Sequence, residues 1–206
     1  MSTFVSGTAL ALALFTLVGC ATTTFTSTWK APDAQPVGPL TGKKVIAFVL
    51  IRKAPASRRE AEDALARQIS LNGAEGVPGY TLVDESQVGN EAQARAAVEK
   101  SGAVGVVVMR PLALDASTKS IPAYTGATYG PYWGGYYGYG WGGAWGTGSE
   151  TVSDLIVRVE TLVYSLQQNK LIWAGQSKTT NPTRVDDFVR ELAVGVAKEM
   201  KKGGLL

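Results

Sequence analysis

Few side chains in this chain could perform chemistry, because its 206 residues include no His and a single Cys, Cys20. Without His no Ser-His-Asp or Cys-His nucleophile can form, and one Cys supports neither an internal disulfide nor a zinc or iron–sulfur site of the usual ligands. Three adjacent pairs remain, Asp84-Glu85, Asp186-Asp187 and Ser177-Lys178. Neighbours on a helix or a strand point apart, so none of these pairs predicts a catalytic dyad. We expect no catalytic residue, no metal ion and no cofactor, and we expect the protein not to be an enzyme.

The most unusual segment is an insert over residues 116–150 that is dense in Gly, Tyr and Trp. Between Pro122 and Ser149 lie ten of the 24 glycines, six of the eight tyrosines and three of the five tryptophans, and no charged residue. Four interpretations stay open: a flexible loop, a platform for sugar rings, a contact with lipid headgroups, and a protein-docking surface. The candidate residues for contact with a ligand or partner are Tyr132, Trp133, Tyr136, Tyr137, Tyr139, Trp141 and Trp145.

The insert also contains a formal G-x-G-x-x-G at Gly138, Gly140 and Gly143. A dinucleotide-binding fingerprint follows a strand and opens a helix, whereas here Gly-rich aromatic sequence surrounds the match. In so Gly-rich a segment the match is expected by chance, and we do not predict nucleotide binding.

The amino terminus carries a targeting signal. Residues Ala9 to Val18 form a ten-residue apolar run. That is about half the ~20 residues that a membrane-spanning helix needs, and it fits the apolar region of a secretory signal. The run leads into Leu17-Val18-Gly19-Cys20, which resembles the bacterial lipobox, although the preceding residues lack Lys and Arg. The resemblance implies a signal peptide over residues 1–19. It also implies a diacylglyceryl thioether on the Cys20 sulfur and a fatty acyl group such as palmitate on its amine.

The implied lipidation sets the expected location. Two or more acyl chains hold a protein stably on a membrane that it does not span. By resemblance to the sorting rule of bacteria with two membranes, a residue other than Asp after the Cys, here Ala21, favours the outer membrane. We expect a protein anchored at the periplasmic face of the cell outer membrane. The alternative is an ordinary secreted protein in which Cys20 falls at this place by chance.

The mature chain is predicted to be one domain behind a tether. Residues 20–43 are rich in Thr, Ser, Pro and Gly and are interpreted as a tether, in which Phe25 and Trp29 leave room for an edge strand. Residues 44–206 have the length of a single domain. The net charge of +3 is too small to predict a nucleic-acid partner.

Strands and helices alternate along this domain. Apolar or alternating runs predict strands over residues 44–51, 79–84, 103–110, 151–166 and 171–179. Helices are predicted from a capping box that starts at Ser57, from Asn90 to Gly102, and from Thr183 to Gly203. The order is β-α-β-α-β, the insert, then β-β-α. This order predicts a single-domain α/β sandwich with a mixed sheet.

Three motifs resemble an uncharacterised bacterial lipoprotein family of the "domain of unknown function" type. They are Thr28-Trp29-Lys30-Ala31-Pro32, Arg58-Arg59-x-x-Glu62-Asp63 and Leu171-Ile172-Trp173-Ala174-Gly175. The charged residues of the second motif are predicted to form a solvated helix start. The element order is similar to that of the TolB amino-terminal domain and of curli-secretion lipoproteins. The resemblance implies an envelope lipoprotein and supplies no catalytic residues.

We therefore expect a structural or accessory role in the cell envelope, carried by contacts with other proteins. The alternative is a glycan- or peptidoglycan-binding module that uses the aromatic insert. A hydrolase would be indicated instead by a deep pocket lined by converging carboxylates.

Overall fold

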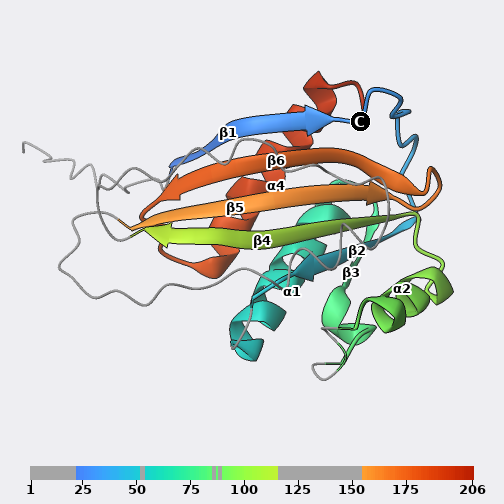
Figure 1. The fold of residues 1–206 in the computed structure, drawn as a ribbon, viewed down its shortest axis with the longest axis horizontal. Coiled ribbons are helices and arrows are strands. Elements are labelled where there is room, and N and C mark those ends of the chain that lie inside the picture. The colour runs from blue at the N-terminus through green and yellow to red at the C-terminus, as the bar shows by residue number, and fades with distance from the viewer. Residues whose placement is uncertain (1–21, 52–53, 85–86, 88–89, 116–154) are drawn as a thin grey trace, which may run out of the picture.

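A six-stranded mixed sheet lies at the centre of the computed structural model, which describes residues 22–51, 54–84, 87, 90–115 and 155–206 (Figure 1). The strands follow the order β1-β6-β5-β4-β2-β3. β2 pairs parallel with β3 and β4, and the other neighbours pair antiparallel. Their bounds are β1 (Thr22–Lys30), β2 (Lys44–Val49), β3 (Glu75–Pro78), β4 (Gly105–Asp115), β5 (Ile156–Ser165) and β6 (Lys170–Thr180). The predicted α/β class and mixed sheet are confirmed.

Helices cover both faces of the sheet. α1 (Pro55–Leu71) and α4 (Val185–Lys202) pack against one face, where their apolar residues meet Val49, Val157 and Val159. α2 (Glu91–Lys100) and the short 3-10 turn η1 (Gly79–Thr81) lie on the other face, over Phe48 and Val108. The two layers follow from the apolar runs in β2 and β4, since a strand that is apolar on both sides must be covered on both sides.

The carboxyl-terminal helix agrees closely with its sequence pattern. α4 buries Val189, Leu192, Val196 and Met200, which repeat at the helical spacing of three and four residues. Its first turn carries acidic residues, its last turn carries Lys201 and Lys202, and Gly203 follows as the C-cap. Charges at these two ends stabilise the helix through its dipole.

Two local predictions are wrong. The capping box at Ser57 does not start α1, because the helix begins at Pro55 with no side-chain cap, and Pro is favoured there by its fixed φ. Residues 79–84 do not form a strand, since β3 ends at Pro78 and a 3-10 turn follows. A Cβ on Gly79 would lie 2.2 Å from the Phe48 ring, so only Gly allows the chain to turn so close to β2. The Asn90 cap of α2 is confirmed, because its side chain accepts a hydrogen bond from the Gln93 N–H.

The segment interpreted as a tether contributes a strand. Eight residues of β1 pair with β6, so residues 22–30 belong to the sheet and not to a tether that ends at residue 43. Phe25 fixes this edge strand to the rest of the fold: its ring meets the Trp173 ring edge-on at 5.8 Å and lies over Gly195 of α4. The possibility of an edge strand at Phe25 and Trp29 is thereby realised.

Candidate functional site

The residues that the sequence singles out as sites lie outside the described part of the chain. This holds for Cys20, for the lipobox residues Leu17, Val18 and Gly19, and for the aromatic residues of the insert, including Trp133 and the formal Gly motif at Gly138. The described residues nevertheless fix where these segments join the fold.

The lipobox and the insert join the sheet at the same end. Thr22 pairs with Thr180, Thr180 pairs with Ile156, and Ile156 pairs with Asp115, so the four residues form one row across β1, β6, β5 and β4. Neighbouring strands are about 4.8 Å apart, which puts Asp115 about 14 Å from Thr22. The insert begins after Asp115 and returns before Ile156, and Thr22 follows Cys20 by two residues. We call this end of the sheet the anchor end. It consists of the row of four residues and of their neighbours on the same four strands.

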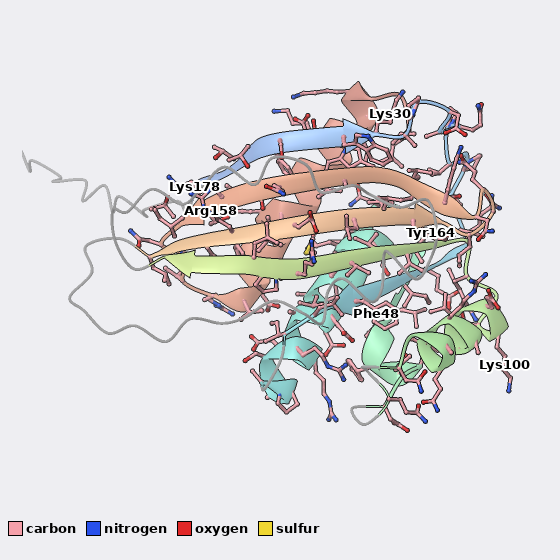
Figure 2. All side chains as sticks on the ribbon, in the orientation of Figure 1. Lys30, Phe48, Lys100, Arg158, Tyr164 and Lys178 are labelled. Atoms are coloured by element: carbon pink, nitrogen blue, oxygen red, sulfur yellow. The ribbon has the colours of Figure 1, made fainter. Side chains whose placement is uncertain are left out.

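Two cations lie side by side near the anchor end. Lys178 of β6 is directly opposite Arg158 of β5, and Figure 2 shows both at the end of the sheet remote from Tyr164 and Lys30. Like charges in such a cross-strand pair repel each other. Further along the same face, Arg110 and Glu160 form a buried ion pair between β4 and β5.

The Ser177-Lys178 pair points to opposite faces, as expected. The Ser177 hydroxyl is buried and donates to the Val159 carbonyl over 3.1 Å, whereas Lys178 lies beside Arg158. The acidic pair at the start of α4 is also divided: Asp186 binds Arg67 at 2.6 Å and Asp187 binds Arg190 at 2.7 Å. Of the remaining pair, Asp84 is exposed and Glu85 lies outside the described residues. Neither of the two pairs that are fully described brings two groups to one point.

The charged start of α1 is not a solvated face, and that prediction is wrong. Arg58 is 2% exposed and Glu62 is fully buried. One oxygen of the Glu62 carboxylate accepts from the Val49 N–H at 3.2 Å, and the other accepts from the Tyr80 N–H at 2.6 Å. The carboxylate therefore joins the end of β2, α1 and η1 in one place.

Burial dominates the electrostatics of Glu62. Desolvation raises the pKa of its carboxyl from 4.5 to about 7, against the opposing effects of the two backbone hydrogen bonds and the Arg58 charge. Next to it, Tyr80 donates to Asp63 at 2.8 Å, and this hydrogen bond raises the pKa of the Tyr80 hydroxyl. Both carboxylate oxygens of Glu62 are occupied by backbone groups, so the cluster holds elements together and is not arranged to receive a substrate.

The sequence contains a signal for this burial that a count of charges misses. Arg58, Glu62, Leu65 and Ile69 are spaced by four, three and four residues, so all four lie along one stripe of α1. Leu65 and Ile69 mark that stripe as the face toward the sheet. Two charges on it indicate a buried and hydrogen-bonded group.

An apolar cavity of about 290 Å³ lies between α1, α4 and the sheet. Its wall is formed mainly by aliphatic side chains, among them Leu65, Ile69, Met109, Val163, Ile172 and Val196. None of the described residues that line it is acidic. The described lining therefore does not have the converging carboxylates that would indicate a hydrolase, and no pattern in the sequence predicted the cavity.

Two further features are absent from the described ranges. Within them, no group of three or more Cys, Asp or Glu residues is placed to hold a metal ion. No helix there has the length and apolar character that a bilayer crossing requires.

Comparison with known proteins adds little. No protein-family model matches the chain, and no curated protein sequence matches it. Among solved structures, two crystal forms of a PelC dodecamer from Paraburkholderia phytofirmans, one of a single-substitution variant, are similar to it. The identities are 13% and 12% and the TM-scores 0.42 and 0.43, over 85% of this chain and 94% of PelC. At these values the similarity is too low to transfer a fold, an activity or an assembly to this chain.

Proposed function

We propose that this protein is anchored to the periplasmic face of the outer membrane by acyl groups on Cys20 and has an accessory role in the cell envelope through contacts with other proteins, without catalysis. The observation that supports this most is the short distance between the lipobox and the fold. β1 begins at Thr22, two residues after Cys20. Two residues of chain span at most about 7 Å.

So short a connection defines the orientation of the domain. With acyl chains on Cys20 in the lipid, the anchor end of the sheet faces the membrane surface. Lys178 and Arg158 then lie close to the phosphate groups of the lipids, where cations are favoured. The opposite end of the sheet, with α2 and the turn after β5, faces away from the membrane and is open to partners.

The described carboxylates also favour a role in binding over catalysis. The two that are fully buried, Glu62 and Glu160, are engaged by backbone N–H groups and by Arg110, and neither lines the cavity. A general acid or base must reach the atom that it protonates or deprotonates.

The anchor is tested by fractionating cells that express the wild type, Cys20→Ser, and Ala21→Ser as a matched control that keeps the Cys. The wild type and Ala21→Ser are expected in the outer-membrane fraction with the added mass of the acyl groups, and Cys20→Ser in the soluble periplasm. Ala21→Asp is expected in the inner membrane, because an Asp at this place retains lipoproteins there by the sorting rule that Cys20 and its neighbours resemble. Retention of Cys20→Ser in the membrane after a salt wash would show that the anchor is elsewhere.

The aromatic composition of the insert favours glycan binding as a second candidate. Tyr and Trp rings stack on sugar rings at a small cost in side-chain entropy. The test is a pull-down on purified peptidoglycan with Trp133, Trp141 and Trp145 all changed to Ala, and with the exposed Val194→Ala as a control outside the insert. Loss of retention in the triple variant alone would support this function. Equal retention of all chains, or no retention of the wild type, would exclude it.

A further inference from the structure

The cavity between α1 and α4 has the properties of a site for a hydrocarbon chain. Its wall is aliphatic on three sides, from the two helices and from β4, β5 and β6. Small side chains on α4, Ala193 and Ala197, leave the space unfilled. Water is held poorly along such an aliphatic wall, because it finds few polar partners there. A hydrocarbon chain in the cavity would supply the van der Waals contacts that the lining side chains otherwise lack.

The volume indicates the size of the occupant. A dry engineered cavity of about 150 Å³ takes up benzene, with its six carbons. The cavity here measures about 290 Å³ and so has room for roughly ten carbons. This fits one straight aliphatic chain.

The opening of the cavity is polar and carries a positive charge. The exposed lining residues, which lie where the cavity meets solvent, include Asn72, Gln167 and Lys201. Among the described residues that line the cavity, Lys201 is the one that carries a charge. An occupant with an anionic end would place that end at Lys201 and its chain against the aliphatic wall.

An exposed apolar side chain borders this opening. Leu206 lines the cavity and is 45% exposed. Large apolar side chains that solvent reaches beside an apolar cavity give a hydrocarbon chain a surface to cross when it enters.

From these observations we propose that the cavity binds one free fatty acid of about ten carbons, with the chain between α1 and α4 and the carboxylate at Lys201. This inference goes beyond the accessory role and does not depend on the lipid anchor, since every residue that carries it lies in the folded domain. The fatty acid is bound without any covalent change.

The test is calorimetric titration with decanoate. The full chain carries Cys20→Ser in all samples so that no detergent, whose alkyl chain would compete, is needed, and it is first stripped of bound lipid on a hydrophobic resin. We expect one saturable site per chain, and weaker binding of decanol, which lacks the charge.

Two pairs of neighbouring residues supply matched controls. Ala193 lines the cavity and Val194 does not, so Ala193→Leu should weaken decanoate binding about tenfold and Val194→Leu should leave it unchanged. Lys201 lines the cavity and Lys202 does not, so Lys201→Gln should weaken binding about threefold while Lys202→Gln has no effect.

The length of the preferred fatty acid distinguishes a variant with a smaller cavity from a variant that has lost its fold. Ala193→Leu shortens the space, so its preferred ligand should shift from decanoate to octanoate or hexanoate, which an unfolded variant could not show. Absence of saturable decanoate binding to the parent chain would overturn the proposal, and so would equal binding by Ala193→Leu. If decanoate does not bind but the chain forms a dimer in sedimentation that Ala193→Leu abolishes, the occupant is a second copy and the fatty acid is excluded.

Discussion

Glu62 gives the sharpest test of the fold, because it should make the protein less stable as the pH rises from 5 to 8. Its carboxyl has a pKa of about 7 in the folded chain, raised from 4.5 by burial. Between these two values the folded state holds a proton that the unfolded state has lost. Stability from this group is therefore fully present below pH 4.5 and is lost as the pH rises through 7.

The size of this loss of stability follows from the two pKa values of Glu62. Between pH 5 and pH 8, a carboxyl whose pKa is about 7 in the folded chain and 4.5 in the unfolded chain changes the free energy of unfolding by about 2–3 kcal/mol. The chain has no His, whose usual pKa lies in this window, so few other groups obscure the effect. Three further pKa shifts lie outside this pH window, since the pKa of Asp33 is lowered from 3.8 and those of Tyr80 and Tyr164 are raised from 10.0.

The assay is urea unfolding at pH 5, 6, 7 and 8 with Glu62→Gln, and with the exposed Glu60→Gln as a control on the same helix. The amide oxygen that Glu62→Gln introduces can accept from one of the two backbone N–H groups, which leaves the other unpaired and costs about 1–3 kcal/mol at low pH. At pH 8 the variant gains stability relative to the wild type, because it buries no charged carboxylate. Glu62→Gln should thus lose the pH dependence of about 2–3 kcal/mol that the wild type and Glu60→Gln retain. A wild type that is equally stable at pH 5 and pH 8, or a variant with the same slope, would refute the assignment.

Three other substitutions test separate parts of the structure by urea unfolding at a fixed pH. Arg110→Met should destabilise by about 3 kcal/mol, because it removes the partner of the buried Glu160, and adding Glu160→Leu should restore much of the loss. Gly76→Ala should cost more than about 2 kcal/mol, since its Cβ would lie 2.0 Å from the Ala66 carbonyl oxygen and α1 would have to move away from β3. Asn90→Ala should cost about 1 kcal/mol through loss of the α2 cap, and a cost near zero would show that the cap does not matter.

Sequence reasoning succeeded where one local rule decides the structure. The apolar stripe of α4 and the Asn90 cap need only neighbours along the chain, and both are as predicted. It failed where contacts between residues that are far apart in the sequence determine the local structure. Whether residues 79–81 extend or turn depends on the Phe48 ring beneath Gly79 and on the Glu62 carboxylate that binds the Tyr80 N–H.

The same distinction between local and distant residues applies to the two candidate sites, the lipobox and the cavity. The lipobox is read from adjacent residues, and it stays a prediction because those residues lie outside the described part of the chain. The cavity arises from the spacing of α1 and α4 over the sheet, to which segments from Leu65 to Lys201 contribute. No local pattern encodes that spacing, so it appears only in three dimensions.

The position of β1 at the edge of the sheet bears on how copies of this protein can meet. β1 has no charged side chain before Lys30, and in the described part of the chain no strand pairs with its outer edge. Such an edge can recruit another strand, and two identical edges related by a two-fold axis pair antiparallel. That pairing would place Thr22 of each copy beside Lys30 of the other, with the two ends about 26 Å apart.

Under the proposed anchoring, the two acyl groups would then point in opposite directions, and one flat bilayer could not hold both. Attachment to the membrane would therefore keep β1 edges apart, and a chain released by Cys20→Ser should form edge-to-edge dimers and larger aggregates more readily than the anchored protein does.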